Sequence, residues 1–323
     1  MKVLVTGNLG YIGPIVAAAL SRNGHEVHGY DTGRYAAFAN GPLPVLARQT
    51  VADLRDEPEI RRAVGRCDAV IQLAAMSNDP LGELDPMLTR SVNLEATQRV
   101  IELCGDRPQV LYSSASVYGM NDELTTEDTA VHPLTLYSEL KVAVELVALQ
   151  RSAALVLRNG TVHGPAPIIR GDLLLNAMVA SAVTSGEIVL MTTAATRRPV
   201  IDVRDLAALT VGLLERGVTG LFNVASANMS IGDAAGLVSR ATGAPVVERH
   251  DGADPRDYAM ATGKLEGASG TWWRPRSLDR SVRDLIDHYT QIGLTRDDVA
   301  TRRYHRIAQY RRSAIPVGTG ADD

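Results

Sequence analysis

The sequence predicts an α/β protein with a doubly wound parallel sheet, joined to a smaller mixed α/β part toward the C-terminus. Three observations lead to this fold class. Short apolar runs alternate with amphipathic helical patterns through the first half of the chain, which is typical of a parallel sheet with helices on both faces. A glycine-rich turn directly follows the first apolar run. After Gly164 the alternation stops, and helices, glycine-rich turns and short strands follow in no regular order.

The spacing of apolar residues places the elements of the first half. Leu140, Ala143, Val144 and Val147, for example, recur at the spacing of one helix face. Gly24 ends the first helical pattern, as glycine commonly does. In chain order we expect a strand at 3–5, a helix at 11–24, strands at 25–31 and 69–73, a helix at 91–105, a strand at 109–116, a helix at 136–150 and a strand at 154–160.

The change of pattern after Gly164 also sets the expected domain boundaries. Residues 1–164 form the first domain, and a helix and a strand near 199–226 return to its sheet. Residues 165–198 and 227–300 form a second, substrate-binding domain. Residues 301–323 begin rich in arginine and end in "GTGADD", which predicts a C-terminal helix and then a loose tail.

Composition and charge exclude several classes of function. The chain has 323 residues, of which 45% are hydrophobic and 22% charged, with a net charge of −4. This balance is that of an ordinary globular protein and gives no sign of a nucleic-acid partner. No apolar run approaches the length of a membrane span, and the N-terminus lacks a signal-peptide pattern. Cys67 and Cys104 are the two cysteines, so we expect a reducing, cytoplasmic location and neither a disulfide framework nor a metal site.

The glycine-rich turn predicts a dinucleotide site. Gly7, Gly10 and Gly13 lie three residues apart, between the first strand and the first helix. Glycine permits a tight turn and a close approach of the backbone to a pyrophosphate, and the helix N-terminus offers free N–H groups.

Acidic residues after the next two strands indicate where the adenosine half of the dinucleotide binds. Asp31 ends the second strand, where a carboxylate can accept from a ribose hydroxyl and would repel a 2′-phosphate. This favours NAD over NADP, although the nearby Arg34 could weaken the preference. Asp53 and Leu54 follow a third strand and are candidates for the adenine edge. Asp53 could instead be a helix N-cap.

Two further motifs connect the turn to a known family. With "SSASVYG" (113–119) and "YSELK" (137–141), the sequence resembles the extended short-chain dehydrogenase/reductase family, which has a Rossmann fold. Within it, the chain looks most similar to the NAD-dependent nucleotide-sugar epimerases and dehydratases. The resemblance runs from Lys2 to about Tyr289. It implies NAD as cofactor and a nucleotide-diphosphate-sugar as substrate.

The resemblance also implies a set of cofactor contacts. It matches the glycine turn at 6–13, a strand end where Gln72 replaces the family's histidine, and a helix asparagine at Asn93. With the residues inferred above, the expected cofactor site comprises Gly7, Leu9, Gly10, Tyr11, Ile12, Gly13, Asp31, Asp53, Leu54, Leu73, Ala74, Ala75, Asn93, Tyr137 and Lys141.

Tyr137, Lys141 and Ser114 are the implied catalytic residues. Tyr137 and Lys141 are one helical turn apart, so their side chains can lie on one face. A tyrosine has a pKa of about 10, and a neighbouring ammonium lowers it. Ser114 would hydrogen-bond the same substrate oxygen, so that Tyr137 takes a hydroxyl proton while hydride leaves for NAD. Taken alone, the five residues of "YSELK" are more typical of a surface pair.

The substrate contacts are less sharply specified. Arg198 and Arg256 match arginines that usually hold substrate phosphates in the family. Asn78, in the loop "MSNDP", could bind sugar hydroxyls or build an Asx-Pro turn. Arg170 and Asn176 could contact the diphosphate, or could be a solvated arginine and a helix-surface asparagine. The full expected set is Met76, Asn78, Ser114, Ser116, Thr161, Arg170, Asn176, Arg198 and Arg256.

The expected reaction is 4-epimerisation of the sugar through a transient 4-keto intermediate. A 4,6-dehydratase needs an extra acid and base, which such enzymes carry directly after the catalytic serine or threonine. Here those positions are Ala115 and Ser116, so dehydration ranks lower. A 4-ketoreductase or a C4/C6 alcohol oxidase would use the same three catalytic residues and stays an alternative.

Two hypotheses of another kind also remain open. One is a non-catalytic NAD(P)-binding sensor on the same fold, against which the presence of both Tyr137 and Lys141 speaks. The other is an oxidoreductase for a non-nucleotide substrate such as a sterol, against which Arg198 and Arg256 speak. Because members of the family usually pair through two helices, corresponding here to 91–104 and 137–149, the resemblance also implies a homodimer.

Overall fold

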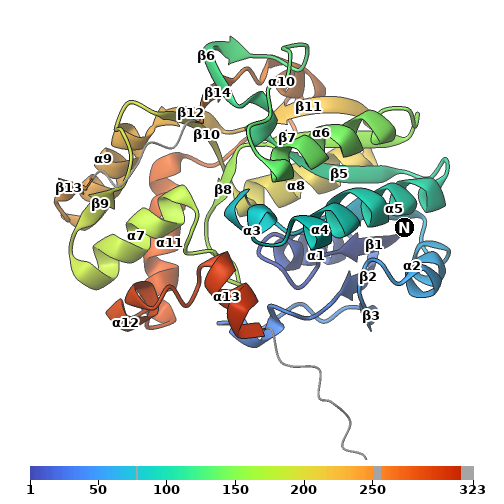
Figure 1. Cartoon of the computed structure of the whole chain (residues 1–323), viewed down its shortest axis with the longest axis horizontal. Helices are drawn as coiled ribbons and strands as arrows, with labels where there is room; N and C mark the ends of the chain where they lie inside the picture. The colour runs from blue at the N-terminus through green and yellow to red at the C-terminus, as the bar shows by residue number, and fades with distance from the viewer. Residues whose placement is uncertain (78, 250–255, 314–323) are drawn as a thin grey trace, which may run out of the picture.

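A seven-stranded sheet, parallel throughout, organises the larger part of the molecule (Figure 1). The computed structural model describes residues 1–77, 79–249 and 256–313. The strand order is β11–β7–β5–β4–β1–β2–β3, which reverses direction at β1 and β4 as in a doubly wound sheet. The strands are β1 (Lys2–Thr6), β2 (Glu26–Asp31), β3 (Arg48–Val51), β4 (Ala69–Gln72), β5 (Gln109–Ser114), β7 (Ala154–Asn159) and β11 (Gly220–Val224).

Helices cover both faces of this sheet. On one face, α1 and α8 pack against each other and share a hydrophobic core with the strands. On the other face, α2, α5 and α6 lie in a row, α5 between the other two. The bounds are α1 (Gly13–Arg22), α2 (Glu57–Val64), α5 (Thr97–Cys104), α6 (Leu136–Ala148) and α8 (Val203–Glu215).

The first strand shows how the sequence builds this layering. Side chains alternate between the two faces of a strand. Val3 and Val5 accordingly belong to the core beneath α1 and α8, whereas Leu4 belongs to the core beneath α2 and α5. All three are buried, because both faces of a parallel sheet are covered.

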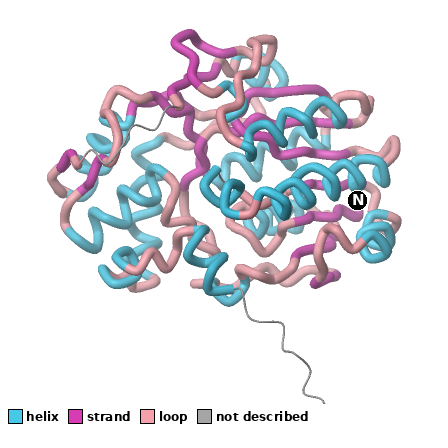
Figure 2. The backbone as a smooth tube through the Cα atoms, viewed as in Figure 1, coloured by secondary structure: helices cyan, strands magenta, loops and turns pink. Residues whose placement is uncertain are grey.

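A smaller part, on the left in Figures 1 and 2, surrounds a separate core of α7, α9 and α11. A three-stranded sheet, β12–β10–β8, and two strand pairs, β9–β13 and β6–β14, complete it. The remaining elements are β6 (Met120–Thr125), β8 (Thr161–His163), α7 (Leu174–Ser185), β9 (Ile188–Leu190), β10 (Arg197–Asp202), β12 (Ala227–Ser230), α9 (Ile231–Thr242), β13 (Val246–Glu248), β14 (Asp257–Met260), α10 (Gly263–Ser269), α11 (Leu278–Gln291), α12 (Arg296–Ala300) and α13 (Arg306–Ser313). Of these, α10 packs against β11 of the seven-stranded sheet.

The doubly wound fold class is confirmed, with adjustments at the element ends. The expected helix at 91–105 is a wider π-helical segment, Ser91–Ala96, that continues into α5. The first helix begins at Gly13 because 7–12 are used by the turn. Two short helices that precede the Ser91–Ala96 segment, α3 (Asp79–Leu84) and α4 (Pro86–Arg90), were not expected. The predicted loose tail, 314–323, lies outside the described residues, and within them no helix has the length and apolar character of a membrane span.

Candidate active site

A long cleft lies at the carboxyl ends of β1, β2, β4, β5 and β7, where open α/β sheets bind ligands. It encloses about 1790 Å³, including the open solvent at its mouth. The predicted cofactor residues that line it are Gly7, Gly10, Tyr11, Ile12, Gly13, Asp31, Asp53, Leu54, Leu73, Ala74, Ala75, Tyr137 and Lys141. The predicted substrate residues that line it are Met76, Ser114, Ser116, Thr161, Arg170 and Arg256.

The glycine turn forms one wall of the cleft. Gly7 has a φ of +72°, and the N–H of Gly10 donates to the Gly7 carbonyl oxygen at 3.1 Å. A Cβ on Gly13 would lie only 2.4 Å from that same oxygen, so a side chain there would force the turn open. Helix α1 begins here without a side-chain cap. Pro14 has no N–H, and the N–H of Ile15 donates to the Ile12 carbonyl at 3.1 Å. The N–H of Gly13 and those of the turn are therefore the groups that an anion such as a pyrophosphate could use.

Asp31 is fastened to this turn. Its Oδ2 accepts from the N–H of Leu9 at 3.0 Å, and its Oδ1 accepts from the N–H of Gly33 at 2.8 Å. Burial raises the pKa of the Asp31 carboxyl, and the two backbone hydrogen bonds oppose that rise. Leu9 itself is not among the residues that line the cleft, so its observed contribution is a backbone hydrogen bond that positions Asp31. A carboxylate held at this place fits the ribose hydroxyls of NAD.

The structure separates the two interpretations of Asp53. Helix α2 is capped by Asp56, whose Oδ1 accepts from the N–H of Glu59 at 3.1 Å. Asp53 lies before the cap, forms a 2.8 Å ion pair with Arg55 and lines the cleft. It is therefore not the N-cap of the helix. Its contact with the adenine edge stays a prediction.

Ser114, Tyr137 and Lys141 meet at the other end of the cleft. Ser114 ends β5, and its Oγ lies 2.8 Å from Oγ of Ser116 while also hydrogen-bonding the Tyr137 side chain. Tyr137 and Lys141 project from the first turns of α6. The Nζ of Lys141 donates to the carbonyl oxygen of Tyr112 at 2.6 Å and lies 5.6 Å from the centroid of the Tyr137 ring.

The pKa of Tyr137 differs from the sequence-based expectation. Burial, and secondarily the charge of Asp79, raise the pKa of the phenol above its ordinary value. The lowering of the Tyr137 pKa that was expected from Lys141 does not dominate, because the Lys141 ammonium faces the Tyr112 carbonyl. Burial also lowers the pKa of Lys141 to about 8, opposed by the charge of Glu145. In this state Tyr137 carries its proton at neutral pH.

Arg256 and Asp79 form an ion pair at the substrate end of the cleft. Asp79 accepts from Nη1 of Arg256 and from Oγ1 of Thr135. Arg198 is 6% exposed and does not line the cleft; its Nη1 donates to the backbone carbonyl of Arg256 at 2.5 Å. The two predicted diphosphate arginines are thus neighbours, and only Arg256 faces the cleft. Asn78 lies outside the described residues.

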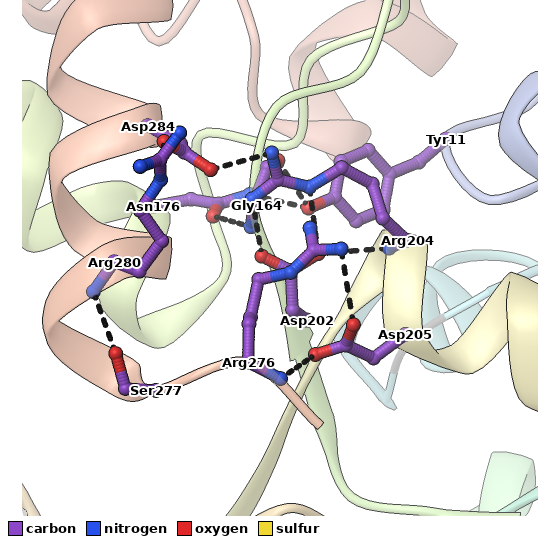
Figure 3. Close-up of polar contacts among 10 residues, drawn as sticks. All are labelled: Tyr11, Gly164, Asn176, Asp202, Arg204, Asp205, Arg276, Ser277, Arg280 and Asp284. Carbon is purple, nitrogen blue, oxygen red and sulfur yellow. Dashed lines mark hydrogen bonds and ion pairs between the residues drawn. The ribbon is translucent and has the colours of Figure 1, made fainter. Parts of the chain in front are cut away.

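Arg170 and Asn176 are buried, which excludes the solvated arginine and the helix-surface asparagine considered as alternatives. Arg170 is 6% exposed and pairs with both carboxylate oxygens of Asp172, at 2.7 and 2.8 Å. Asn176 is fully buried; it accepts from the N–H of Gly164 at 3.0 Å and donates to the hydroxyl of Tyr11 at 3.1 Å (Figure 3). Asn176 therefore ties the glycine turn to α7, and contact with substrate stays a prediction.

Asn93 plays a comparable supporting role. It is buried, and its side chain accepts from the N–H of Met76 at 2.7 Å and donates to the carbonyl of Met76 at 3.1 Å. Both ends of the amide thereby fix the loop after β4. Asn93 is not among the cleft-lining residues, so its predicted cofactor contact stays a prediction.

A charged network anchors the β10–α8 junction to α11 (Figure 3). Asp202 ends β10, caps α8, and accepts from Arg204 at 2.7 and 3.0 Å and from Arg276 at 3.1 Å. Arg204 also pairs with Asp284 on α11 at 2.7 Å. Asp202 is thus used in joining the two parts of the molecule.

Several cleft residues were not predicted from the sequence, among them Tyr35, Asn159, Tyr258 and Arg306. Tyr258 adjoins the predicted Arg256, so its position in the chain was a usable signal. Arg306 comes from α13, beyond the segment that carried the family resemblance, and no pattern in the sequence distinguishes it from the neighbouring arginines. Among the described residues, no cluster of His, Cys, Asp and Glu could hold a metal ion.

Comparisons with curated proteins give a consistent family. The chain is 30% identical over 237 residues, 70% of its length, to the probable low-salt glycan biosynthesis reductase Agl14 of Haloferax volcanii, of which it covers 75%. It is also 30% identical to a probable UDP-glucuronate 4-epimerase of Rhizobium meliloti, over 51% of this chain and 54% of that protein. The chain thus spans three quarters of the first relative and about half of the second.

Solved structures and a family model agree with these relatives. The UDP-glucose 4-epimerase of Thermus thermophilus in complex with NAD superposes with a TM-score of 0.76 at 25% identity, over 90% of this chain and 99% of that one. The NDP-hexosamine 5,6-dehydratase TunA superposes with a TM-score of 0.79 at 22% identity, over 90% and 98%, and supports the fold alone. Residues 3–225 match the model of the NAD dependent epimerase/dehydratase family. The chain therefore belongs to the NAD-dependent epimerase/dehydratase family of enzymes, whose cofactor is NAD.

Proposed function

We propose that the protein is a nucleotide-diphosphate-sugar 4-epimerase that acts through a transient 4-keto sugar. The observation that carries this proposal is the convergence of Ser114, Tyr137 and Lys141 on one end of a cleft whose other end fits a dinucleotide. Sugar epimerases named among the relatives and neighbours support the substrate class. A proton-exchanging phenol and a redox cofactor are the two components that reversible oxidation of an alcohol requires.

Each of the three side chains has a distinct role in this proposal. Tyr137 exchanges the proton of the sugar hydroxyl, and Ser114 hydrogen-bonds the same oxygen. Acceptance of the proton requires the phenolate, which a charged ammonium nearby favours. Lys141 has a pKa of about 8 and is therefore charged at neutral pH. NAD would be held by the glycine turn and Asp31 and would supply the reversible hydride transfer that inversion at carbon 4 needs.

The carboxylates of the cleft argue against 4,6-dehydration. Elimination of water needs an acid and a base beside the substrate in addition to the redox residues. Ala115 and Ser116 follow the catalytic serine, and neither can supply this chemistry. Of the described cleft residues, Asp31 and Asp53 lie on the cofactor side, and Asp79 is paired with Arg256. We therefore rank dehydration below epimerisation.

A 4-ketoreductase is the second candidate, and one specific observation favours it. The Haloferax volcanii relative, of which the match covers 75%, is named a probable reductase. The same three side chains would serve a one-way reduction, with Tyr137 donating its proton to the ketone oxygen. The raised pKa of Tyr137 is compatible with that direction.

A substrate deuterated at carbon 4 distinguishes these reactions. The purified protein, with catalytic NAD, is incubated with UDP-, dTDP- and GDP-sugars, and products are followed by mass spectrometry and NMR. An epimerase gives the inverted sugar at unchanged mass with the label still on carbon 4, and no NADH accumulates. Stoichiometric consumption of NADH with a 4-keto sugar would assign a reductase, and a product lighter by one water would assign a dehydratase.

We further propose that two chains pair through α6 and the helix formed by 91–104. Leu146 on α6 and Leu149 at its C-cap are 63% and 40% exposed, which leaves apolar surface at the end of this helix. Exposed apolar side chains on a helix that already packs on the sheet are typical of a protein interface. Light scattering coupled to size-exclusion chromatography is expected to give a mass near twice 34.6 kDa, and Leu146→Glu is expected to shift it toward one chain.

A further inference from the structure

Arg306, on the C-terminal helix α13, reaches into the cofactor cleft. It is 2% exposed and belongs to the residues that line the cleft. Its guanidinium carbon lies 3.7 Å from the centroid of the Tyr35 ring, a stacking contact with a residue just after β2. Figure 1 shows α13 beside the blue segment that follows β2. The end of the described chain therefore takes part in the site formed by its beginning.

The positive charge of Arg306 has little compensation within the described residues. Its Nε, although buried, has no hydrogen-bond partner there, and its Nη1 meets Oε1 of Gln309 at 3.3 Å. None of the ion pairs formed in the described part of the chain includes it. Arg170, which is also buried in this cleft, instead donates hydrogen bonds to both carboxylate oxygens of Asp172. A buried guanidinium without a matching anion is costly, so a ligand that supplies one would bind favourably.

The charges that face Arg306 place it at the cofactor side of the cleft. Arg170 repels it, whereas Asp172 and Asp31 attract it, and burial with this repulsion lowers its pKa to about 10. Asp31 is already engaged by the N–H groups of Leu9 and Gly33. Asp172 is already engaged by Arg170. Neither carboxylate is hydrogen-bonded to Arg306, although both interact with it electrostatically.

We propose that Arg306 binds the diphosphate of the dinucleotide from the side of the cleft opposite the glycine turn. The turn supplies backbone N–H groups at the start of α1, and Arg306 supplies a planar pair of N–H donors that matches phosphate oxygens. Its stacking on Tyr35, just after the strand that ends at Asp31, is the contact that points to the cofactor. This inference concerns the cofactor and does not depend on which sugar reaction the protein catalyses.

Contacts of α13 with the segment after β2 hold Arg306 in position. The guanidinium of Arg34 lies 4.7 Å from the centroid of the Tyr310 ring, and its Nη1 donates to Oγ of Ser313 at 3.4 Å. The hydroxyl of Tyr304, just before α13, donates to Oδ1 of Asn40 at 2.9 Å. Because both contacts bridge to the segment beside Asp31, docking of α13 and binding of the cofactor stabilise the same arrangement.

Binding measurements on Arg306→Gln test the assignment without any assay of activity. After removal of copurified cofactor, calorimetry gives dissociation constants for NAD⁺, ADP-ribose, NADP⁺ and UDP. Loss of a charge-assisted pair should weaken NAD⁺ and ADP-ribose alike by about 10- to 100-fold. Binding of UDP, which reports the substrate diphosphate, should stay within about twofold of the wild-type value. Arg311→Gln, an exposed arginine on the same helix, is the matched control and should bind all four ligands like wild type.

Three outcomes would overturn the proposal. One is a folded Arg306→Gln variant that binds NAD⁺ as tightly as wild type. Another is a loss confined to UDP, which would assign Arg306 to the substrate. The third is a larger loss for NADP⁺ than for NAD⁺, which would assign it to a 2′-phosphate. If circular dichroism shows that Arg306→Gln does not fold, Arg306→Lys decides: it keeps the charge, loses the paired donors and should weaken NAD⁺ by about 3- to 10-fold, and an unchanged affinity contradicts the proposal.

Discussion

The ammonium group of Lys141 lies 5.6 Å from the centroid of the Tyr137 ring and donates its hydrogen bond to the backbone of Tyr112. The Lys141 and Tyr137 side chains are thus close enough to interact electrostatically. The Tyr137 side chain also forms a hydrogen bond with Ser114. Burial acts on both groups in the direction of their neutral forms, raising the pKa of Tyr137 and lowering that of Lys141. The proton exchange proposed for Tyr137 therefore depends on Lys141 keeping its charge.

Tyr137→Phe is expected to remove most of the activity. The variant keeps the ring and loses the hydroxyl that is proposed to exchange the substrate proton, so kcat/KM should fall by about 10²- to 10⁴-fold. Tyr289→Phe is a matched control, because Tyr289 is buried among the α7–α9–α11 helices and its hydroxyl has no hydrogen-bond partner among the described residues. Steady-state kinetics of both variants with the same nucleotide sugar provide the comparison. Wild-type turnover by Tyr137→Phe would contradict the catalytic role.

The pH dependence of activity should report Lys141. Its pKa of about 8 means that the ammonium is present below pH 8 and is lost as the pH rises through that value. Since the charged form favours the phenolate of Tyr137, kcat/KM should decline above about pH 8. Lys141→Arg keeps a charge throughout this range and should move the decline to higher pH, even if its maximum is lower. A wild-type profile that stays flat from pH 7 to about pH 9.5 would show that the charge of Lys141 is not required.

Backbone atoms of the glycine turn pack directly against Gly13, so Gly13→Ala is a direct test of the dinucleotide site. A Cβ on residue 13 would lie 2.4 Å from the Gly7 oxygen and 2.5 Å from Cα of Asn8. Since both are backbone atoms, the turn has to open, and NAD⁺ affinity should fall by at least about tenfold. Gly267→Ala is the control: that glycine lies in α10, and no atom lies within 4 Å of its added Cβ. Equal NAD⁺ affinities in calorimetry would place the cofactor elsewhere.

The sheet, and the positions of Ser114 and Tyr137 in the cleft, could be predicted because their signals are local in the sequence. The alternation of apolar runs and helical patterns needs no knowledge of distant contacts, and the strands expected at 3–5, 25–31, 69–73, 109–116 and 154–160 all belong to the seven-stranded sheet. Ser114 and Tyr137 each lie in a short motif at an element end. Such motifs fix a residue's place in the fold before any tertiary contact is known.

The remaining features depend on contacts between distant parts of the chain. Asp53 and Asp56 are equally able to cap a helix on chemical grounds, and the structure selects Asp56. Arg170 and Asn176 gave no sign of burial, because their partners are set by how α7 packs beside the glycine turn. The expected direction for the pKa of Tyr137, a lowering by Lys141, was wrong, since burial raises it. Burial is a property of the assembled fold.

The buried ion pair of Glu145 and Arg158 should be the most sensitive polar contact in the core near the site. Their side chains are 3% and 7% exposed, and Arg158 reaches both carboxylate oxygens, with a shortest distance of 2.7 Å. Arg158→Met leaves a buried carboxylate without its partner, which should lower the free energy of unfolding by about 3–5 kcal/mol. Urea denaturation followed by circular dichroism measures this loss.

A surface pair provides the matched control for that measurement. Glu57 is partly exposed and pairs with Arg61, one helical turn along α2, and with Arg99 on α5, and Glu57→Gln should change stability much less than Arg158→Met. Glu145 also accepts from the hydroxyl of Ser113, the neighbour of Ser114. Loss of Arg158 should therefore lower kcat as well as stability, because the carboxylate that positions the end of β5 is no longer held. If Arg158→Met and Glu57→Gln cost the same, the buried pair does not stabilise this fold.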